Sequence, residues 1–176
     1  MALPGGSEFR VKHVLCPVDF SDVAKAASDY AVLIGRQFAA HVSLLHVAEE
    51  PTFAAPGHEP ALATQASRDR QRDLKQQLAL FGYRPHLVDT MVSTHVLVIT
   101  EHSVVQSIVD AARDLEASLI VMGTHGRSGL GRFVFGSTTE AVIRHSRIPV
   151  LAVPFPRVRS TTSSARWRGR ALGREG

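Results

Sequence analysis

Apolar residues along the chain follow two patterns that alternate. Short runs rich in β-branched residues predict strands at 13–20, 41–48, 118–123 and 148–154. Between these runs, apolar residues recur every three or four positions, which predicts helices at 21–40, 61–81, 103–115 and 137–145. The segment 84–103 is less regular, and its alternating β-type residues predict one further strand. Five strands alternating with four helices predict an α/β fold, a single doubly wound five-stranded parallel sheet with helices on both faces, of Rossmann-like type.

The helical spacing also predicts which side chains face the core. The predicted inward stripe of the first helix consists of Val23, Ala27, Tyr30, Ile34 and Phe38. The second helix turns Leu74, Leu78 and Phe81 inward and stops at Gly82, and the third buries Val104, Val105, Ile108, Val109 and Ala112. Ser21 is a natural N-cap for the first helix, with Asp22 favourable near its positive end.

The positive charge of the chain is concentrated at one end. The formal net charge is +4, but residues 157–176 hold six of the 20 basic residues and one of the 16 acidic residues. The remainder has 14 basic against 15 acidic residues, so no domain face is predicted to be basic. We therefore predict a flexible N-terminus at 1–10, a single folded domain at 11–155 and a basic, disordered tail at 156–176.

The tail has two interpretations. A solubilising segment explains its Ser, Gly and Arg content without any partner. Basic tails also bind nucleic acid or acidic lipid, and the position of Trp167, the single tryptophan, is the one point in favour of a partner. The rest of the composition, with 44% hydrophobic and 20% charged residues, is that of an ordinary globular protein.

Several classes of protein do not fit the sequence. No apolar run approaches the roughly 20 residues of a membrane span, and the N-terminus lacks the pattern of a secretory signal. The single cysteine, Cys16, allows neither an intrachain disulfide nor a cysteine zinc cluster, and it is predicted to be a small core residue. The expected location is the cytoplasm. The histidines show no convincing pairing of metal ligands.

A glycine-rich stretch follows the strand at 118–123. Five glycines fall within residues 123–136, a density that indicates either very tight turns or a molecule lying against the backbone. Gly131 to Ser137 lacks the lysine of a Walker phosphate loop, and the dinucleotide pattern G-x-G-x-x-G is absent. In parallel sheets ligands bind beyond the carboxyl ends of the strands. If the first and fourth strands are neighbours, Pro17-Val18-Asp19 and the glycine loop face one crevice.

The spacing that remains is Gly123-x2-Gly126-x9-Gly136-Ser137. It resembles the nucleotide-binding motif G-x2-G-x9-G-[ST] of the universal stress protein family. The segments "VLCPVDFS", "LLHV", "LIVMGTHGR" and "IPVLAVP" resemble four strands of that family in the same order, so the likeness covers about 11–154. One departure is the segment "VITEHSVVQ", which lacks the Gly-x-Pro turn that family members commonly have before the third helix.

The resemblance implies a role for each matching residue in holding ATP, with Mg²⁺ held mainly by the phosphates. Asp19 takes the adenine or ribose end, Pro17 and Val18 shape the wall, and Val47 packs on the adenine. On the other side, Met122 and Gly123 line the ribose, while the phosphates lie against His125, Gly126, Arg127, Gly136, Ser137 and Thr138.

Each of these residues also has a simpler interpretation. Ser137 and Glu140 match the capping box S-x-x-E, which needs no ligand, and this alternative weighs equally for Ser137. Asp19 could cap the first helix beside Ser21, Met122 could be a core residue, and Arg127 could be a solvated loop charge.

The leading functional hypothesis is therefore an ATP-binding universal stress protein, a nucleotide-dependent regulator of the stress response. No general base or carboxylate pair for a metal is evident, so slow ATP hydrolysis at most is expected. The alternative is a nucleotide-independent interaction module of the same fold that acts on an unidentified protein partner through its dimer face and basic tail. The resemblance also implies a homodimer formed through the strand at 148–154. An adenylate-transferring enzyme is a weaker third possibility, since the additional phosphate loops of such enzymes are missing.

Overall fold

The computed structural model describes residues 10–49, 60–82, 91–99, 103–124 and 136–154. Strands and helices alternate along these residues as the sequence predicts. Their bounds are β1 (His13–Pro17), α1 (Asp22–Phe38), β2 (His41–Glu49), α2 (Pro60–Gly82), β3 (Val92–Ile99), α3 (Val104–Asp114), β4 (Leu119–Gly123), α4 (Ser137–His145) and β5 (Val150–Val153).

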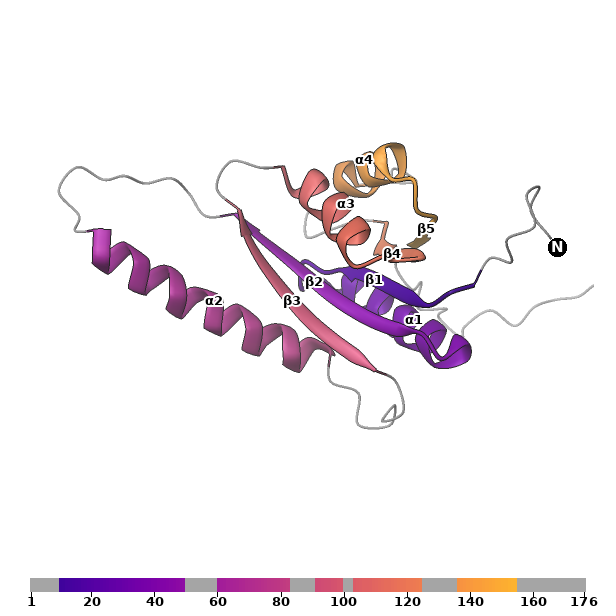
Figure 1. Cartoon of the computed structure of the whole chain (residues 1–176), viewed down its shortest axis with the longest axis horizontal. Helices are drawn as coiled ribbons and strands as arrows, with labels where there is room; N and C mark the ends of the chain where they lie inside the picture. The colour runs from indigo at the N-terminus through magenta and orange to yellow at the C-terminus, as the bar shows by residue number, and fades with distance from the viewer. Residues whose placement is uncertain (1–9, 50–59, 83–90, 100–102, 125–135, 155–176) are drawn as a thin grey trace, which may run out of the picture.

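The strands form one parallel sheet in the order β3-β2-β1-β4-β5 (Figure 1). The chain builds outward from β1 to β2 and β3, then returns to place β4 on the other side of β1. The predicted fold class is confirmed, and so is the condition that the first and fourth strands are neighbours. The point where the strand order reverses therefore lies between β1 and β4, which is where open parallel sheets bind ligands.

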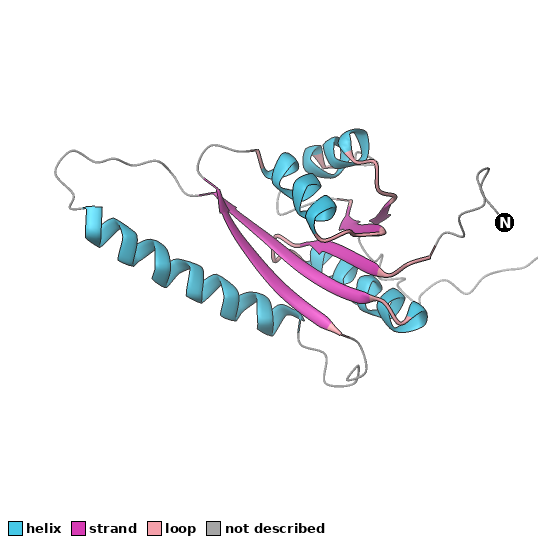
Figure 2. Cartoon of the chain, in the orientation of Figure 1, coloured by secondary structure: helices cyan, strands magenta, loops and turns pink. Residues whose placement is uncertain are grey.

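Helices cover both faces of the sheet (Figure 2). Alternate residues of each strand point to opposite faces, so Leu44 and its neighbour Leu45 belong to different cores. Leu44 packs in the core beneath α1 and α2, together with Ala27 and Leu78. Leu45 packs in the core beneath α3 and α4, together with Ile108 and Val142.

The predicted inward face of α1 is partly wrong. Val23 and Ala27 are buried, but Tyr30 and Phe38 are 53% and 57% exposed. The buried face consists mainly of small residues, and its members are Val23, Ala24, Ala27, Ser28, Ala31, Val32 and Gly35. Small side chains let the helix axis lie close to the sheet, so the larger aromatic residues are left on the outer side.

Four predicted strands are shorter in the structure; 118–123 becomes Leu119–Gly123 and 148–154 becomes Val150–Val153. The first ends at Pro17 instead of residue 20, and Phe20 itself has a left-handed backbone with φ of 63°, which an extended strand cannot include. The third spans Val92–Ile99, and most of the rest of the predicted range 84–103 lies outside the described residues. The cores are predicted better, since Cys16 and Leu78 are fully buried and α2 ends at Gly82 as expected.

Candidate nucleotide-binding crevice

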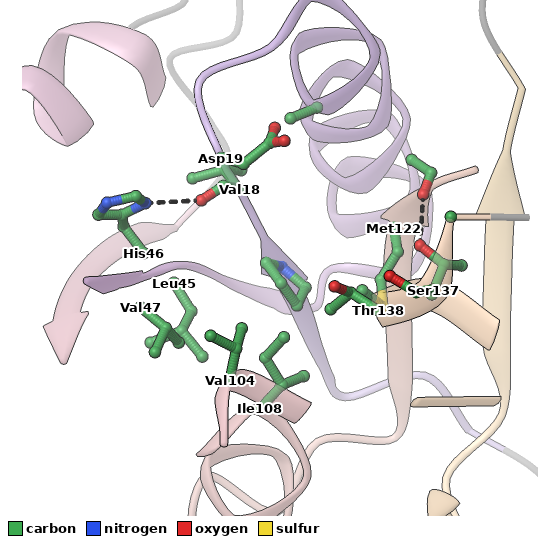
Figure 3. Close-up of a pocket in the computed structure, with 15 residues that line it drawn as sticks. Val18, Asp19, Leu45, His46, Val47, Val104, Ile108, Met122, Ser137 and Thr138 are labelled. Carbon is green, nitrogen blue, oxygen red and sulfur yellow. Dashed lines mark hydrogen bonds between the residues drawn. The ribbon is translucent and has the colours of Figure 1, made fainter. Parts of the chain in front are cut away.

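A cavity of about 340 Å³ opens at the carboxyl ends of β1, β2 and β4 (Figure 3). Nine of the residues predicted for the nucleotide site line it: Pro17, Val18, Asp19, Val47, Met122, Gly123, Gly136, Ser137 and Thr138. Six further residues complete the lining: Ala24, Leu45, His46, Val104, Ile108 and Thr139. The predicted residues His125, Gly126 and Arg127 lie outside the described residues, as does the basic tail.

One side of the crevice is apolar. Leu45 and Val47 project from the end of β2, and Met122 projects from β4 (Figure 3). Val104 and Ile108 complete this wall from the first turns of α3, where residues four apart lie on the same helix face. The helical spacing predicts these two residues only as part of the core. Their i, i+4 spacing at the start of a helix that follows a parallel strand is the signal that could have placed them at the crevice.

Asp19 forms part of the opposite wall, in the turn between β1 and α1. Its Oδ1 atom accepts hydrogen bonds from the backbone N–H of Ser21 at 3.1 Å and from the Ser21 hydroxyl at 2.6 Å. The Ser21 Oγ atom in turn accepts from the backbone N–H of Ala24 at 3.2 Å, so Ser21 is the N-cap as predicted. Asp19 is thus not the cap itself, and it holds the cap from the crevice side.

The start of α4 forms the polar end of the crevice. Its N-cap is Gly136, and no side chain caps this helix among the described residues. The capping box predicted from Ser137 and Glu140 is therefore wrong, because Ser137 is already the first helical residue. Glu140 instead pairs with Arg144 at 2.8 Å. The Ser137 side chain lines the crevice without a capping role.

Two hydrogen bonds fix the start of α4 to the end of β4. The Gly136 N–H donates to the Thr124 carbonyl at 2.6 Å, and the Thr139 hydroxyl donates to the Gly123 carbonyl at 2.7 Å. The N–H of Thr124 also donates to Val153 of β5 at 2.8 Å. The two sides of the crevice floor are therefore joined directly. Thr139, buried and unassigned by sequence, is the residue that makes this connection.

Packing against α1 explains why residue 123 is a glycine. A Cβ atom at Gly123 would lie 2.7 Å from Cγ1 of Val23 and 3.2 Å from its backbone carbonyl carbon. Contacts this short do not occur in folded proteins without movement of a neighbour. The glycine is thus required by the close approach of β4 and α1, although its backbone also lines the crevice. Substituting Gly123 would test folding as much as ligand binding.

A second polar cluster occupies the opposite, amino-terminal end of the sheet. Nε2 of His13 on β1 lies 2.8 Å from the Ser43 hydroxyl on β2. Ser43 in turn contacts the Ser93 hydroxyl at 2.9 Å and Nε2 of His95 at 3.2 Å, both on β3. Ser93 and His95 are also joined, at 3.0 Å. The His41 ring packs edge-on against His13 with 4.8 Å between centroids, and its Nδ1 is buried without a hydrogen-bond partner among the described residues.

Partial burial disfavours the charged forms of His13 and His95. The pKa of His13 is lowered, mainly because desolvation disfavours the charged imidazole; a backbone hydrogen bond with Leu115 opposes this, and His41 and His95 add like-charge repulsion. The pKa of His95 is lowered by desolvation and then by His41. In the described part of the chain, no three His, Cys, Asp or Glu side chains are arranged to hold a metal ion. No described helix is both long and apolar enough to cross a membrane.

The model of the universal stress protein family matches residues 10–154, which include every described strand and helix. The chain belongs to the universal stress protein family. A universal stress protein of Methanocaldococcus jannaschii is 30% identical over 152 residues, which cover 83% of this chain and 84% of that protein. A second universal stress protein of the same organism is 28% identical over 162 residues, covering 81% and 94%.

Solved structures give the same assignment for this universal stress protein. A universal stress protein of Lactobacillus plantarum superposes with a TM-score of 0.63 at 28% identity, covering 82% of this chain and 98% of that one. A family member from Burkholderia pseudomallei superposes with a TM-score of 0.61 at 28% identity, covering 82% and 96%. The family and the fold indicated by the sequence are therefore confirmed.

Proposed function

We propose that this universal stress protein binds ATP in the crevice at the carboxyl ends of β1, β2 and β4. The observation that supports this most directly is the division of the crevice into an apolar side and an uncapped helix N-terminus. An adenine nucleotide has the same division, with a flat apolar base at one end and phosphates at the other. The volume of about 340 Å³ is within the range of roughly 300–1,000 Å³ that is typical of small-molecule pockets.

The apolar side suits a purine base. Leu45 and Val47 from β2 and Val104 and Ile108 from α3 lie side by side in one apolar wall (Figure 3). Branched aliphatic side chains make dispersion contacts with the face of a planar ring and exclude water from it. Met122 closes the inner end, and it is 5% exposed.

The start of α4 suits the phosphates. The first N–H groups of any α-helix lack an acceptor within the helix, and the positive end of the helix dipole lies behind them. At α4 these groups belong to Ser137, Thr138 and Thr139, all of which line the crevice. Because no described side chain caps them, an anion can accept their hydrogen bonds. The hydroxyl groups of Ser137 and Thr138 add further donors.

Asp19 is assigned to the ribose or adenine, whose hydroxyl or amino groups donate hydrogen bonds to carboxylates. Magnesium remains on the phosphates, since the described residues offer no ligand cluster for it. Because the described residues present neither such a cluster nor an evident general base, the proposed role is nucleotide-dependent regulation, with ATP hydrolysis that is slow at most.

Nucleotide complexes are known among proteins with this fold. One solved universal stress protein is in complex with cAMP, and one from Archaeoglobus fulgidus is in complex with dAMP. Their identities to this chain are 22% and 20%, so the likeness is one of fold. The proposal for this chain rests on its own crevice residues.

Calorimetric titration of the full chain with MgATP tests the proposal. We expect a dissociation constant in the micromolar range or tighter, which corresponds to a binding free energy of about −8 kcal/mol or below. Asp19→Asn keeps Oδ1 as an acceptor for Ser21 but removes the charge, and we expect it to weaken binding about tenfold. Asp114→Asn, at the far end of α3, is the matched control and should leave affinity unchanged. A folded wild-type protein that gives no signal with MgATP would refute the proposal.

The alternative is an interaction module that acts through a dimer face. In the described sheet, β5 is an edge strand, and its Leu151 is 38% exposed. An apolar edge strand tends to pair with another chain. This alternative predicts a dimeric mass by light scattering that Leu151→Arg converts to a monomer. Partner capture that depends on residues 157–176 and ignores ATP would favour this alternative over nucleotide-dependent regulation.

A further inference from the structure

Both backbone polar groups of Val18, its N–H and its carbonyl, are bonded to residues of β2. Its N–H donates to the carbonyl of Leu45 at 2.8 Å, which continues the β1–β2 pairing one residue beyond the strand. Its carbonyl lies 2.8 Å from Nδ1 of His46 (Figure 3). A carbonyl oxygen can only accept, so Nδ1 of His46 carries the proton. Two consecutive residues of β2 therefore fix the residue immediately before Asp19.

The ring of His46 is itself held by aromatic packing. Phe20 stacks on it at 4.4 Å between centroids, tilted by 44°, and Phe81 at the end of α2 packs edge-on against Phe20 at 5.6 Å. Lys25 donates to the Phe81 carbonyl at 3.0 Å and lies 5.1 Å above its ring. The histidine thus belongs to a cluster that joins α2 to the turn after β1.

Phe20 shows why this turn needs support. Its φ of 63° is in the left-handed region, where a bulky L-residue is rare and disfavoured. Such a conformation persists only when the surroundings enforce it, and Phe20 is held by the rings of His46 and Phe81 as well as by the core against which it packs. With Val18 fixed on one side and Phe20 on the other, the orientation of Asp19 between them is determined.

We propose that His46 is a positioning residue for the nucleotide site, which sets the direction of the Asp19 carboxylate by holding Val18 and Phe20. The second ring nitrogen of His46 points away from the other labelled residues of the crevice (Figure 3). His46 therefore acts through the turn. The role in binding rests on the proposed function, whereas the role in ordering the turn does not.

A purely structural histidine makes a different prediction from a positioning one. If His46 only filled space in the fold, its loss would lower the protection of all core amides together. If His46 positions the turn, its loss lowers the protection of the amides of residues 18–21 and leaves the other core amides protected. The backbone N–H of Ser21 is a direct reporter, because its acceptor is Oδ1 of Asp19. The N–H of Leu44, in the middle of β2 and fully buried, is the internal reference.

Three variants separate the contribution of the His46 hydrogen bond from that of its ring. His46→Leu removes the donor and keeps similar bulk. His46→Asn places an amide donor near the position of Nδ1 and removes the ring. His145→Leu is the matched control, because the exposed His145 makes the same kind of bond, from Nδ1 to the Ala141 carbonyl at 2.7 Å, at the C-terminal end of α4.

The first measurement uses the ligand-free full chain and follows amide hydrogen exchange by NMR. We expect His46→Leu to speed exchange at Val18 and Ser21 by about tenfold relative to Leu44, the effect of one lost hydrogen bond. His46→Asn should restore most of the protection, and His145→Leu should change nothing at these positions. Equal acceleration at Leu44, or unchanged exchange at Ser21, would overturn the proposal.

The second measurement is MgATP affinity by calorimetry. We expect about tenfold weaker binding for His46→Leu, recovery to within about threefold for His46→Asn, and no change for His145→Leu. Affinity that is unchanged in His46→Leu, in a wild type that binds, would overturn the positioning role in binding. If the wild type binds no ATP, the proposed function fails, while the exchange result still decides whether His46 orders the turn.

Discussion

Polar groups have different surroundings at the two ends of the central strands. At the amino end, the side chains of His13, Ser43 and His95 bond to one another across β1, β2 and β3. At the carboxyl end, the hydroxyl of Ser137 and the first N–H groups of α4 face a cavity, and no described side chain caps that helix. The same strands therefore carry a closed polar network at one end and an open polar surface at the other.

This difference shows that residue type is a poor guide to function in this sheet. Three histidines and two serines gather at the amino end, a set that could suggest chemistry, yet the hydroxyl groups and imidazoles of His13 and His95 are directed at each other. The carboxyl end, as far as it is described, leaves donors available for a ligand. Changes at the amino end should affect stability, and changes at the carboxyl end should affect binding.

The largest expected effect is on binding, from Val104→Glu. The carboxylate would lie in the apolar wall of the crevice and lose its hydration when a base binds. We therefore expect ATP affinity to fall about 100-fold or more, a loss of about 2.7 kcal/mol of binding free energy. An acidic residue in the first turn of α3 is compatible with the helix dipole, so the fold should be retained. Calorimetry and circular dichroism measure the two effects.

Val105→Glu is the control for this change. Val105 is also half-buried in the first turn of α3, but it does not line the crevice. Its substitution should leave ATP affinity within about threefold of the wild type. Equal loss of affinity in both variants would contradict the assignment of the apolar wall.

The counterpart at the amino end is Ser43→Ala, which should lower stability. Ser43 is fully buried and contacts His13, Ser93 and His95, so its loss removes three contacts with half-buried polar groups. We expect the free energy of unfolding to fall by about 1–3 kcal/mol in a urea titration. ATP affinity of the folded variant should be unchanged. A specific loss of affinity would contradict the assignment of stability to the amino end and of binding to the carboxyl end.

Two serines at helix starts allow the same division to be tested with one type of substitution. Ser103 caps α3 through a bond from the Gln106 N–H at 3.1 Å, so Ser103→Ala should cost about 1 kcal/mol of stability. Ser137 makes no cap, so Ser137→Ala should leave stability nearly unchanged. We expect it to weaken ATP binding about three- to tenfold. The reverse result, with stability lost in Ser137→Ala, would show that this hydroxyl is structural.

The smallest expected effect is a pH dependence of stability from the amino end. His13 and His95 have lowered pKa values in the folded state, so the unfolded chain binds more protons as the pH falls below the ordinary histidine pKa of about 6.5. Their contribution to stability is therefore full above that pH and is lost as the pH falls through the folded-state pKa values. Both rings are partly hydrated, which limits the size of the effect.

Thermal unfolding between pH 7.5 and 5 measures this dependence. His13→Gln/His95→Gln, which keeps polar groups near the Nε2 positions, should show a smaller loss of melting temperature over that range than the wild type. An equal loss in the two proteins would assign the pH dependence to other groups.

Sequence patterns predicted the parts of the fold that depend on local periodicity. The bounds of α4 and the burial of Leu78 agree with the structure. The adjacency of β1 and β4 was only a condition of the argument from sequence, and the structure meets that condition. The inward face of α1 was predicted wrongly, because large apolar residues dominate a periodicity argument whereas the helix packs through alanines. Tyr30 and Phe38, which the periodicity places in the core, are therefore exposed in the structure.

The crevice was predicted in part, for a similar reason. The resemblance identified residues on β1, β2, β4 and α4, but Val104, Ile108 and Thr139 line the crevice because tertiary packing brings the first turns of α3 and α4 to it. The role of Gly123 could not be assigned from sequence, since its contact with Val23 joins residues a hundred positions apart. The network around Ser43 likewise depends on the register of three strands, which a single sequence does not determine.

The paired bonds that join Gly136 to Thr124 and Thr139 to Gly123 have a consequence for variation in this protein. They hold Gly136 beside the end of β4, so the distance between Thr124 and Gly136 is already set. Loop-closure entropy grows slowly with length, by about 0.6 kcal/mol for each doubling. A change in the number of residues between Thr124 and Gly136 should therefore cost the sheet little stability, so the ligand preference of the crevice can evolve without loss of the fold.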